Sequence, residues 1–316
     1  MQSIRLTLRG TSSIRAFSTS RMLRSDLSFQ VYGPEKEEAV RSPIVFLHGL
    51  FGSKQNNRSI SKLYLSKREF LAPRTHTSDL TTHDRALARD LKRQVFTLDL
   101  RNHGHSFHAE EHNYSVMAED VTKFIRQQNL DQCVLIGHSM GAKTAMTVAL
   151  DSPSLVSALI PVDNAPVNAV LKSDFGKYIQ GMQHVEAERV TKQSDADKIL
   201  QDYEESLPIR QFLLTNLVRS EEDKTMKFRV PLAVLGSSLG SMADFPYLEP
   251  GSVRYDGPTL FVRGTKSPYV SDDAIPSIKK FFPNSQIADV EAGHWLISEN
   301  PEAFRQAVVK FLQKTP

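Results

Sequence analysis

Cysteine is almost absent from this chain: its 316 residues include one, Cys133. No disulfide can form within the chain, and this composition suits a reducing compartment. Cys133 lies in the apolar run CVLIGHS, which predicts a small buried core residue rather than a reactive thiol. Long hydrophobic runs are also absent, because no apolar stretch approaches the length of a membrane span, so no transmembrane segment is predicted.

Acidic residues are missing from residues 1–24, which contain five arginines. Without these arginines the formal charge of +3 becomes −2, so the positive balance predicts no nucleic-acid partner. A leader rich in arginine, serine and threonine is typical of a mitochondrial presequence, and RAFSTSRMLR resembles the processing pattern of matrix proteins. We therefore expect a presequence cleaved near Arg24 and a location in the mitochondrial matrix. A disordered basic tail is the alternative.

Seven segments predict β-strands. The first alternates in polarity and predicts an antiparallel strand, whereas the others are apolar runs typical of strands covered on both faces of a parallel sheet. Strands that alternate with helices predict an α/β fold with a doubly wound, mostly parallel sheet. The predicted strands are 27–33, 43–49, 93–100, 132–139, 157–164, 258–264 and 285–293, and helical patterns occupy 115–129, 140–152 and 301–314.

Two stretches interrupt this alternation. Residues 165–250 are helical in pattern and mixed in polarity, and they separate two core strands. Long inserts at strand ends often contact the substrate, so we predict a helical lid. Residues 56–92 are longer than a strand-to-helix connection requires and lack clear periodicity. They predict a surface insertion, with a wrongly placed exon boundary as the alternative.

The sequence IGHSMGA places Ser139 in a G-x-S-x-G pattern after a predicted strand and before a helix. Gly137 and Gly141 remove side chains that would clash at a sharp turn, and the turn pushes the serine hydroxyl out of the sheet. A serine hydroxyl reacts well only when a base takes its proton and donors stabilise the oxyanion. The free backbone N–H of Met140 is one predicted donor. The alternative is a serine that merely caps a helix.

A second loop, FLHGLFGSK, follows the strand 43–49 and can turn another N–H group toward the same oxyanion. Leu50 is the first choice for this donor and Phe51 the second. His48 could be mistaken for the catalytic base, but we expect it to brace the loop through hydrogen bonds.

The predicted base is His294, in EAGHWLISENP, between the last strand and the last helix. An imidazole there can reach over the carboxyl edge of the sheet and take the proton of Ser139. The histidine needs an acid to fix its tautomer and stabilise its charge.

The acid is not where it usually stands, because the loop after PTLFVRG contains Ser267 at that place. Asp272 and Asp273 follow in a context that predicts a helix N-terminus, where capping explains them. Asp163 ends the strand after the nucleophile's helix, and an acid at that strand end can reach the histidine. We favour Asp163 for its strand-end position and for the chain order Ser, Asp, His; Asp272 and Asp273 stay as alternatives.

Other residues near these motifs have the side chains of possible functional groups. Four histidines in and after DLRNHGHS lack matching carboxylates or cysteines, so no metal site is predicted, and the loop is expected to be structural. Trp295 and Phe51 are candidates for an acyl pocket, although core packing is their default. Lys143 is expected to be solvated. The four histidines are His103, His105, His108 and His112.

Together these motifs resemble one branch of the α/β hydrolases, over roughly residues 27–314. The branch contains mitochondrial abhydrolase-domain esterases and thioesterases, bacterial esterases and yeast ethanol acetyltransferases. The resemblance implies that the acid is the aspartate of VD-x-AP and that serine occupies the usual acid position, in agreement with Asp163 and Ser267. Two departures are the longer segment 56–92 and Ala142, where glycine is common. The matching motifs are LHGLFGSK, DLRNHGHS, GHSMGAKTAM, VDNAP, RGTKSPYV and AGHW.

The resemblance implies hydrolysis of short-chain esters or thioesters, or acyl transfer from acetyl-CoA to an alcohol. The sequence therefore predicts a serine-nucleophile acyl enzyme in an α/β-hydrolase domain, 25–316. Its partners would be a small ester or acyl-CoA and a small alcohol acceptor, and the chemistry needs no metal or redox cofactor. The alternatives are an alcohol acetyltransferase that makes ethyl acetate on the same triad, and a mitochondrial binding or stabilising protein without activity.

Overall fold

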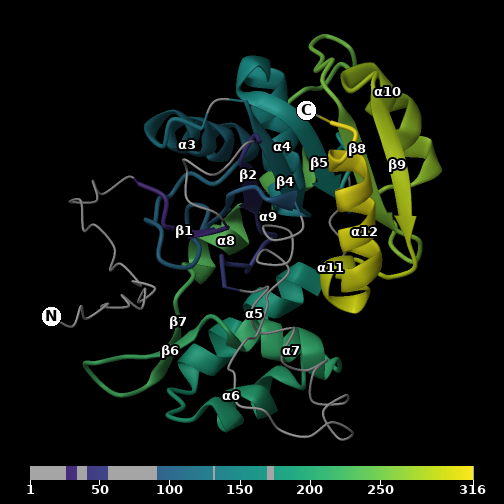
Figure 1. Ribbon diagram of the computed structural model, residues 1–316. Coiled ribbons are helices and arrows are strands. Elements are labelled where there is room, and N and C mark those ends of the chain that lie inside the picture. Colours follow the sequence, from purple (N-terminus) through teal and green to yellow (C-terminus); the bar gives the residue numbers. More distant parts are fainter. Residues whose placement is uncertain (1–25, 34–40, 56–90, 131, 169–173, 316) are drawn as a thin grey trace, which may run out of the picture.

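The computed structural model describes residues 26–33, 41–55, 91–130, 132–168 and 174–315 (Figure 1). The predicted presequence, 1–24, lies outside the described residues, and so does all of the predicted insertion 56–92 except its last two residues. Both therefore stay predictions.

The centre of the fold is a seven-stranded sheet with the order β1-β3-β2-β4-β5-β8-β9. The first strand runs antiparallel to β3, and every other neighbouring pair is parallel, as predicted. β2, β3 and β4 are buried along their whole length, which explains their continuous apolar sequences. The strands are β1 Phe29–Tyr32, β2 Ile44–Leu47, β3 Val95–Leu98, β4 Cys133–His138, β5 Val156–Val162, β8 Thr259–Gly264 and β9 Ser285–Val290.

Helices cover both faces of the sheet. Alternate residues of β4 point to opposite faces, so that Leu135 packs with α3 and α4 while Ile136 packs with α12. α4 is buried at every position from Met140 to Leu150, because it lies between the sheet and its helical neighbours. The helices are α3 Tyr114–Gln127, α4 Met140–Asp151, α10 Ile275–Phe281, α11 Leu296–Glu299 and α12 Pro301–Leu312, with short 3-10 helices at Pro153–Leu155 and Asp272–Ala274.

In the segment 165–250, residues 174–228 gather beyond the end of the sheet toward which β9 points (Figure 1), whereas Ala243 lies against α4, where Lys143 donates to its backbone oxygen. The segment was predicted to be helical, but it also contains an antiparallel hairpin, β6–β7. The hairpin strands have three residues each, which is too short for a periodic pattern to reveal them. The described elements are α5 Asp174–Ala187, α6 Gln193–Leu200, α7 Leu207–Leu214, β6 Leu217–Arg219, β7 Met226–Phe228, α8 Leu232–Ser237 and α9 Leu239–Ala243.

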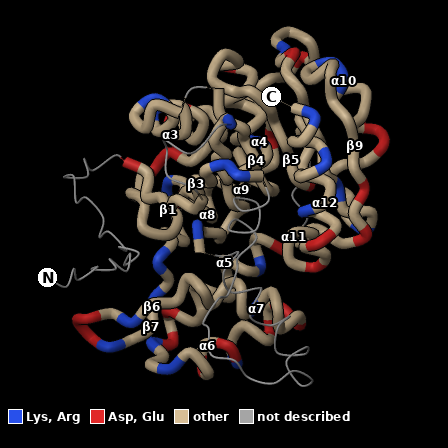
Figure 2. The backbone as a smooth tube through the Cα atoms, viewed as in Figure 1, with Lys and Arg blue, Asp and Glu red and all other residues tan. Residues whose placement is uncertain are grey.

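Charges of both signs are distributed over the described chain (Figure 2). Among the described helices, none combines the length and the apolarity needed to cross a membrane. Cys133 is fully buried, and burial raises the pKa of its thiol to about 12. The prediction of an unreactive core cysteine is therefore confirmed.

Candidate active site

Ser139 lies on a sharp turn between β4 and α4. Its backbone has φ 54° and ψ −114°, a conformation that costs a non-glycine residue about 1–3 kcal/mol. The turn is possible because a side chain at Gly137 would lie 2.0 Å from the carbonyl oxygen of Gly141, and one at Gly141 would lie 2.4 Å from that of Leu47. The two glycines thus allow the strand and the helix to approach closely and leave the serine at the tip of the turn.

The structure brings together the three side chains that the sequence singled out. His294 Nε2 lies 2.9 Å from Ser139 Oγ, and His294 Nδ1 lies 2.7 Å from Asp163 Oδ2. Asp163 is completely buried. Because Nδ1 faces a carboxylate, it carries the ring proton, which leaves Nε2 free to accept the hydroxyl proton of Ser139.

Asp163 has two further hydrogen-bond donors at the end of β8. The backbone N–H of Gly264 donates to Oδ1 at 2.9 Å, and the hydroxyl of Ser267 donates to Oδ2 at 2.5 Å. Ser267, at the usual position of the acid in the loop after β8, thus contacts the carboxylate of Asp163. The alternative acids lie elsewhere: Asp272 forms an ion pair with Arg263 at 2.6 Å, and Asp273, in the same 3-10 helix, is exposed.

The imidazole of His294 has other rings close to it. The ring of Tyr269 is 4.2 Å away between centroids, and that of His138 is 5.1 Å away. Burial lowers the pKa of His138 to about 4, so this ring is neutral near pH 7 and its Nε2–H donates to the backbone oxygen of His294 at 2.8 Å. Sequence reasoning missed this contact, although the position of His138 beside the nucleophile could have suggested it.

The two predicted oxyanion donors lie on loops that meet at Ser139. A side chain on Gly49 would approach Ser139 Cβ to 3.3 Å, so the loop after β2 lies directly against the nucleophile. Among the described residues, we find no hydrogen-bond partner for the backbone N–H of Leu50 or of Met140. The N–H of Phe51, the second choice, instead donates to His103 Nε2 at 3.1 Å. Leu50 is therefore the better candidate of the two.

His48 lies under this loop, away from the hydroxyl of Ser139. Its Nε2 accepts the backbone N–H of Leu100 at 3.0 Å, and its Nδ1–H donates to the backbone oxygen of Gly49 at 2.8 Å. Burial lowers its pKa below the usual value and keeps the ring neutral. Through these two bonds His48 connects the loop after β2 to the end of β3, as predicted.

The two candidates for the acyl pocket have different surroundings. Phe51 has no exposed surface and packs against Phe175 of α5 at 6.2 Å between ring centroids, as a core residue does. Trp295 is half-buried and lies 4.7 Å from the ring of Phe212 on α7. Together with His138, these two rings line a hollow beside the nucleophile's turn. Of the two candidates, Trp295 is the one that lines this hollow, and its contact with a substrate stays a prediction.

The expectation that Lys143 is solvated is wrong. Its side chain is 1% exposed, and its ammonium group donates to the backbone oxygens of Ala243 and Asp244 at 2.8 Å. Desolvation lowers the pKa of Lys143 from 10.5 to about 8. The error arose because α4 is buried all round, and the sequence does not reveal which segment packs against its polar side chain.

The described histidines after β3 have structural contacts: His103 bonds both to its own loop and to the N–H of Phe51. His103 is buried and His105 is largely exposed, while His112 Nδ1 lies 3.3 Å from the side-chain amide of Asn102. In the part of the chain that the structure describes, no group of three or more His, Cys, Asp or Glu side chains is arranged to hold a metal ion.

Comparisons with known proteins agree with this architecture. The family described as alpha/beta hydrolase fold matches residues 42–301. A Xenopus laevis protein named sn-1-specific diacylglycerol lipase ABHD11 is 40% identical over 91% of this chain and 84% of its own length. A Saccharomyces cerevisiae protein named "probable alcohol acetyltransferase" is 36% identical, over 92% of this chain and 84% of its own.

Among solved structures, a marine microorganism esterase superimposes with a TM-score of 0.75 at 29% identity, covering 91% of this chain and 99% of its own. The match to the family covers most of the described sheet and includes Ser139, Asp163 and His294. The resemblance inferred from the motifs is confirmed, and the chain belongs to the α/β hydrolase fold family.

Proposed function

We propose that this protein is a serine acyl enzyme that hydrolyses short-chain carboxylic esters or thioesters. The observation that carries the proposal is the continuous hydrogen-bonded path from Ser139 Oγ through both imidazole nitrogens of His294 to Asp163. A path of this kind activates a serine hydroxyl for attack on an acyl carbonyl. The lipase and esterase names of similar proteins support acyl chemistry at this site.

The reaction begins when Ser139 Oγ attacks the acyl carbonyl and its proton passes to His294 Nε2. Negative charge develops on the carbonyl oxygen, which the backbone N–H groups of Leu50 and Met140 stabilise. Asp163 keeps its charge throughout and stabilises the imidazolium. His294 then gives the proton to the leaving alkoxide or thiolate as the bond to the acyl carbon breaks, and an acyl-enzyme remains on Ser139.

A second nucleophile completes the cycle. Water, deprotonated by His294, attacks the acyl-enzyme and releases the carboxylic acid together with free Ser139. An alcohol that takes the place of water would form a new ester instead, and acetyl-CoA would then be the acyl donor. This second candidate function is favoured by the similarity to the yeast protein named as an alcohol acetyltransferase. Both functions use the same acyl-enzyme.

Two measurements test the proposal. A fluorophosphonate probe should label the native protein at Ser139 and leave the folded Ser139→Ala variant unlabelled. With acetyl-CoA in the presence of ethanol, the yields of acetate and ethyl acetate then give the partition between water and alcohol. We expect acetate to dominate, whereas mainly ethyl acetate would favour the acetyltransferase. A folded wild-type protein that reacts with neither reagent would leave only the non-catalytic binding role.

A further inference from the structure

Phe51 has an unusual backbone conformation for a large side chain. Its φ is +60°, in the left-handed region that favours glycine. It is the third residue of a tight turn, because the N–H of Gly52 donates to the oxygen of Gly49 at 2.9 Å. Such turns have two common forms that differ by a flip of the central peptide, and the form with positive φ at the third position normally needs glycine or asparagine there. Something outside the turn must therefore hold this form.

Two side chains from distant parts of the chain hold Phe51. His103 accepts its backbone N–H through Nε2 at 3.1 Å, and Asn216 donates to its backbone oxygen through Nδ2 at 2.8 Å. His103 is completely buried and Asn216 is 3% exposed, so water does not compete with either bond. Both polar groups of the strained residue thus have a fixed partner, and a flip of the central peptide would break the bond to His103.

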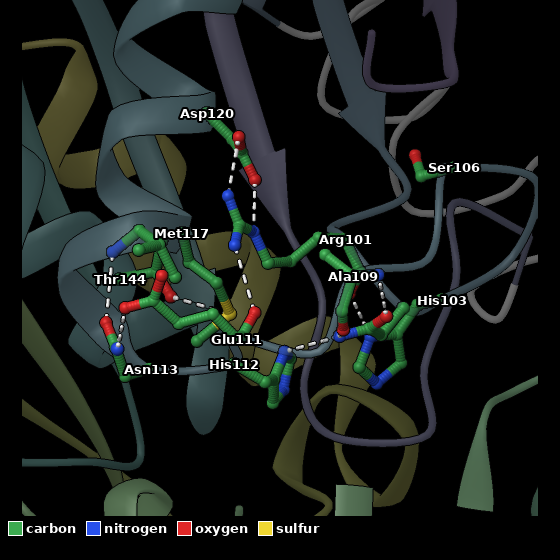
Figure 3. A network of polar contacts seen from close by, with 12 residues as sticks. Arg101, His103, Ser106, Ala109, Glu111, His112, Asn113, Met117, Asp120 and Thr144 are labelled. Carbon is green, nitrogen blue, oxygen red and sulfur yellow. Dashed lines mark hydrogen bonds and ion pairs between the residues drawn. The ribbon is translucent and has the colours of Figure 1, made fainter. Parts of the chain in front are cut away.

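The first partner is fixed by the body of the fold. The Nδ1–H of His103 donates to the backbone oxygen of Arg101 at 2.9 Å, which leaves Nε2 as an acceptor. Arg101 in turn reaches Asp120 on α3 through two hydrogen bonds of 2.6 and 3.0 Å (Figure 3). The loop after β3 is thereby attached to α3, and His103 has little freedom to follow a moving turn.

The second partner comes from the segment 165–250. Asn216 lies between α7 and β6, where its N–H donates to the backbone oxygen of Leu213 at 3.1 Å and its own backbone oxygen accepts the N–H of Arg229 at 2.8 Å. Its position therefore follows that of α7 and of the β6–β7 hairpin. Through Asn216, the predicted lid contacts the turn that carries Leu50.

We propose that Asn216 is a positioning residue for the oxyanion hole: it anchors the backbone oxygen of Phe51, while His103 anchors the N–H, and so it keeps the turn and the N–H of Leu50 in place beside Ser139. This inference rests on the proposed function. Oxyanion donors act because they are oriented before the charge develops. Removal of the Asn216 amide would leave the bond to His103 but release the Phe51–Gly52 end of the turn, so the turn could shift and the Leu50 N–H would lose its fixed position.

The test compares Asn216→Leu, which keeps a similar volume without a donor, with Asn216→Ser, which keeps a hydroxyl donor. The readouts are kcat, KM, the pH profile of kcat/KM and inhibition by a trifluoromethyl ketone, whose adduct with Ser139 has an oxyanion. We expect kcat of Asn216→Leu to fall about 10-fold, less than the 10²–10³-fold loss of a whole donor. The inhibition constant should rise by a similar factor, with KM and the pH profile unchanged and an intermediate loss in Asn216→Ser.

Tyr114→Phe is the matched control, because the hydroxyl of Tyr114 donates to the backbone oxygen of Met242 and so makes another bond to the segment 165–250. It should leave kcat and the inhibition constant as they are. Wild-type kinetics in folded Asn216→Leu, or an equal loss in Tyr114→Phe, would overturn the inference. If Asn216→Leu does not fold, a wild-type inhibition constant in Asn216→Asp would overturn it instead. Fluorophosphonate labelling of wild-type Ser139 separates these outcomes from a failure of the proposed function.

Discussion

At the residue scale, the carboxylate of Asp163 has three hydrogen-bond donors among the described residues, and they have two kinds of role. His294 is the partner that the proposed chemistry uses, while Gly264 and Ser267 orient the carboxylate. The hydroxyl of Ser267 shares Oδ2 with His294, so it competes for the same oxygen and also restricts its rotation. We therefore expect loss of the Ser267 hydroxyl to weaken the activity without abolishing it.

Ser267→Ala should lower kcat/KM about 10-fold, the low end of the effect of a hydrogen bond to a charged group, about 1.5–3 kcal/mol, because the other two donors remain. Steady-state kinetics with a p-nitrophenyl ester would measure this loss. Ser271→Ala, in the same loop and without a side-chain capping bond, is the matched control and should behave as wild type. A loss as large as that of Ser139→Ala would contradict this secondary role.

At the scale of elements, α4 is attached to the end of α9 by Lys143. The ammonium group bonds two backbone oxygens in a buried place, and desolvation lowers the pKa of Lys143 from 10.5 to about 8. Between pH 8 and 10.5 the unfolded chain therefore binds more protons at this group than the folded protein does. The contribution of Lys143 to stability thus rises with pH across this window and is constant below it.

The variant Lys143→Met tests whether the contribution of Lys143 to stability rises with pH. We expect the free energy of unfolding of wild type, minus that of the variant, to rise by roughly 2–3 kcal/mol from pH 7.5 to 10.5, since one pKa unit corresponds to about 1.4 kcal/mol. Denaturant titrations at both pH values give the difference, and groups common to both proteins cancel. A difference that stays constant or falls with pH would show that Lys143 does not titrate as its burial requires.

The same elements show how far sequence patterns reach. Strand β4 and helix α3 were predicted close to their observed bounds. In both elements the spacing of apolar residues in the sequence matches the residues that are buried in the fold. The hairpin β6–β7 and the burial of Lys143 were not predicted. Both depend on how the segment 165–250 packs against the body of the fold, and local sequence contains little information on that packing.

At the scale of the whole molecule, the site is assembled from three strand ends. Ser139 follows β4, Asp163 follows β5, and His294 follows β9. Parallel strands bring their carboxyl ends to one edge of the sheet, so residues at these ends could be placed near one another from the sequence alone. The position of Asp163 at a strand end therefore favours it over Asp272 and Asp273 from the sequence alone.

The contact of Asn216 with Phe51 had no comparable signal. It joins residues 165 positions apart, and neither lies in a pattern that predicts the other. Strand order and motif spacing therefore located the reacting groups, whereas the side chains that hold the turn around Leu50 depend on the three-dimensional packing of the 165–250 segment. The sequence therefore predicts the sheet, but it does not predict which side chains hold the turn that carries Leu50.

The central claim is that Asp163 is the acid behind His294, and the kcat of Asp163→Asn tests it most directly. An amide at this position keeps the shape but cannot stabilise the imidazolium, so kcat should fall about 10⁴-fold in the folded variant. Asp272→Asn is the matched control and should retain the kcat of wild type. Full activity in Asp163→Asn, or a comparable loss in Asp272→Asn, would contradict the account.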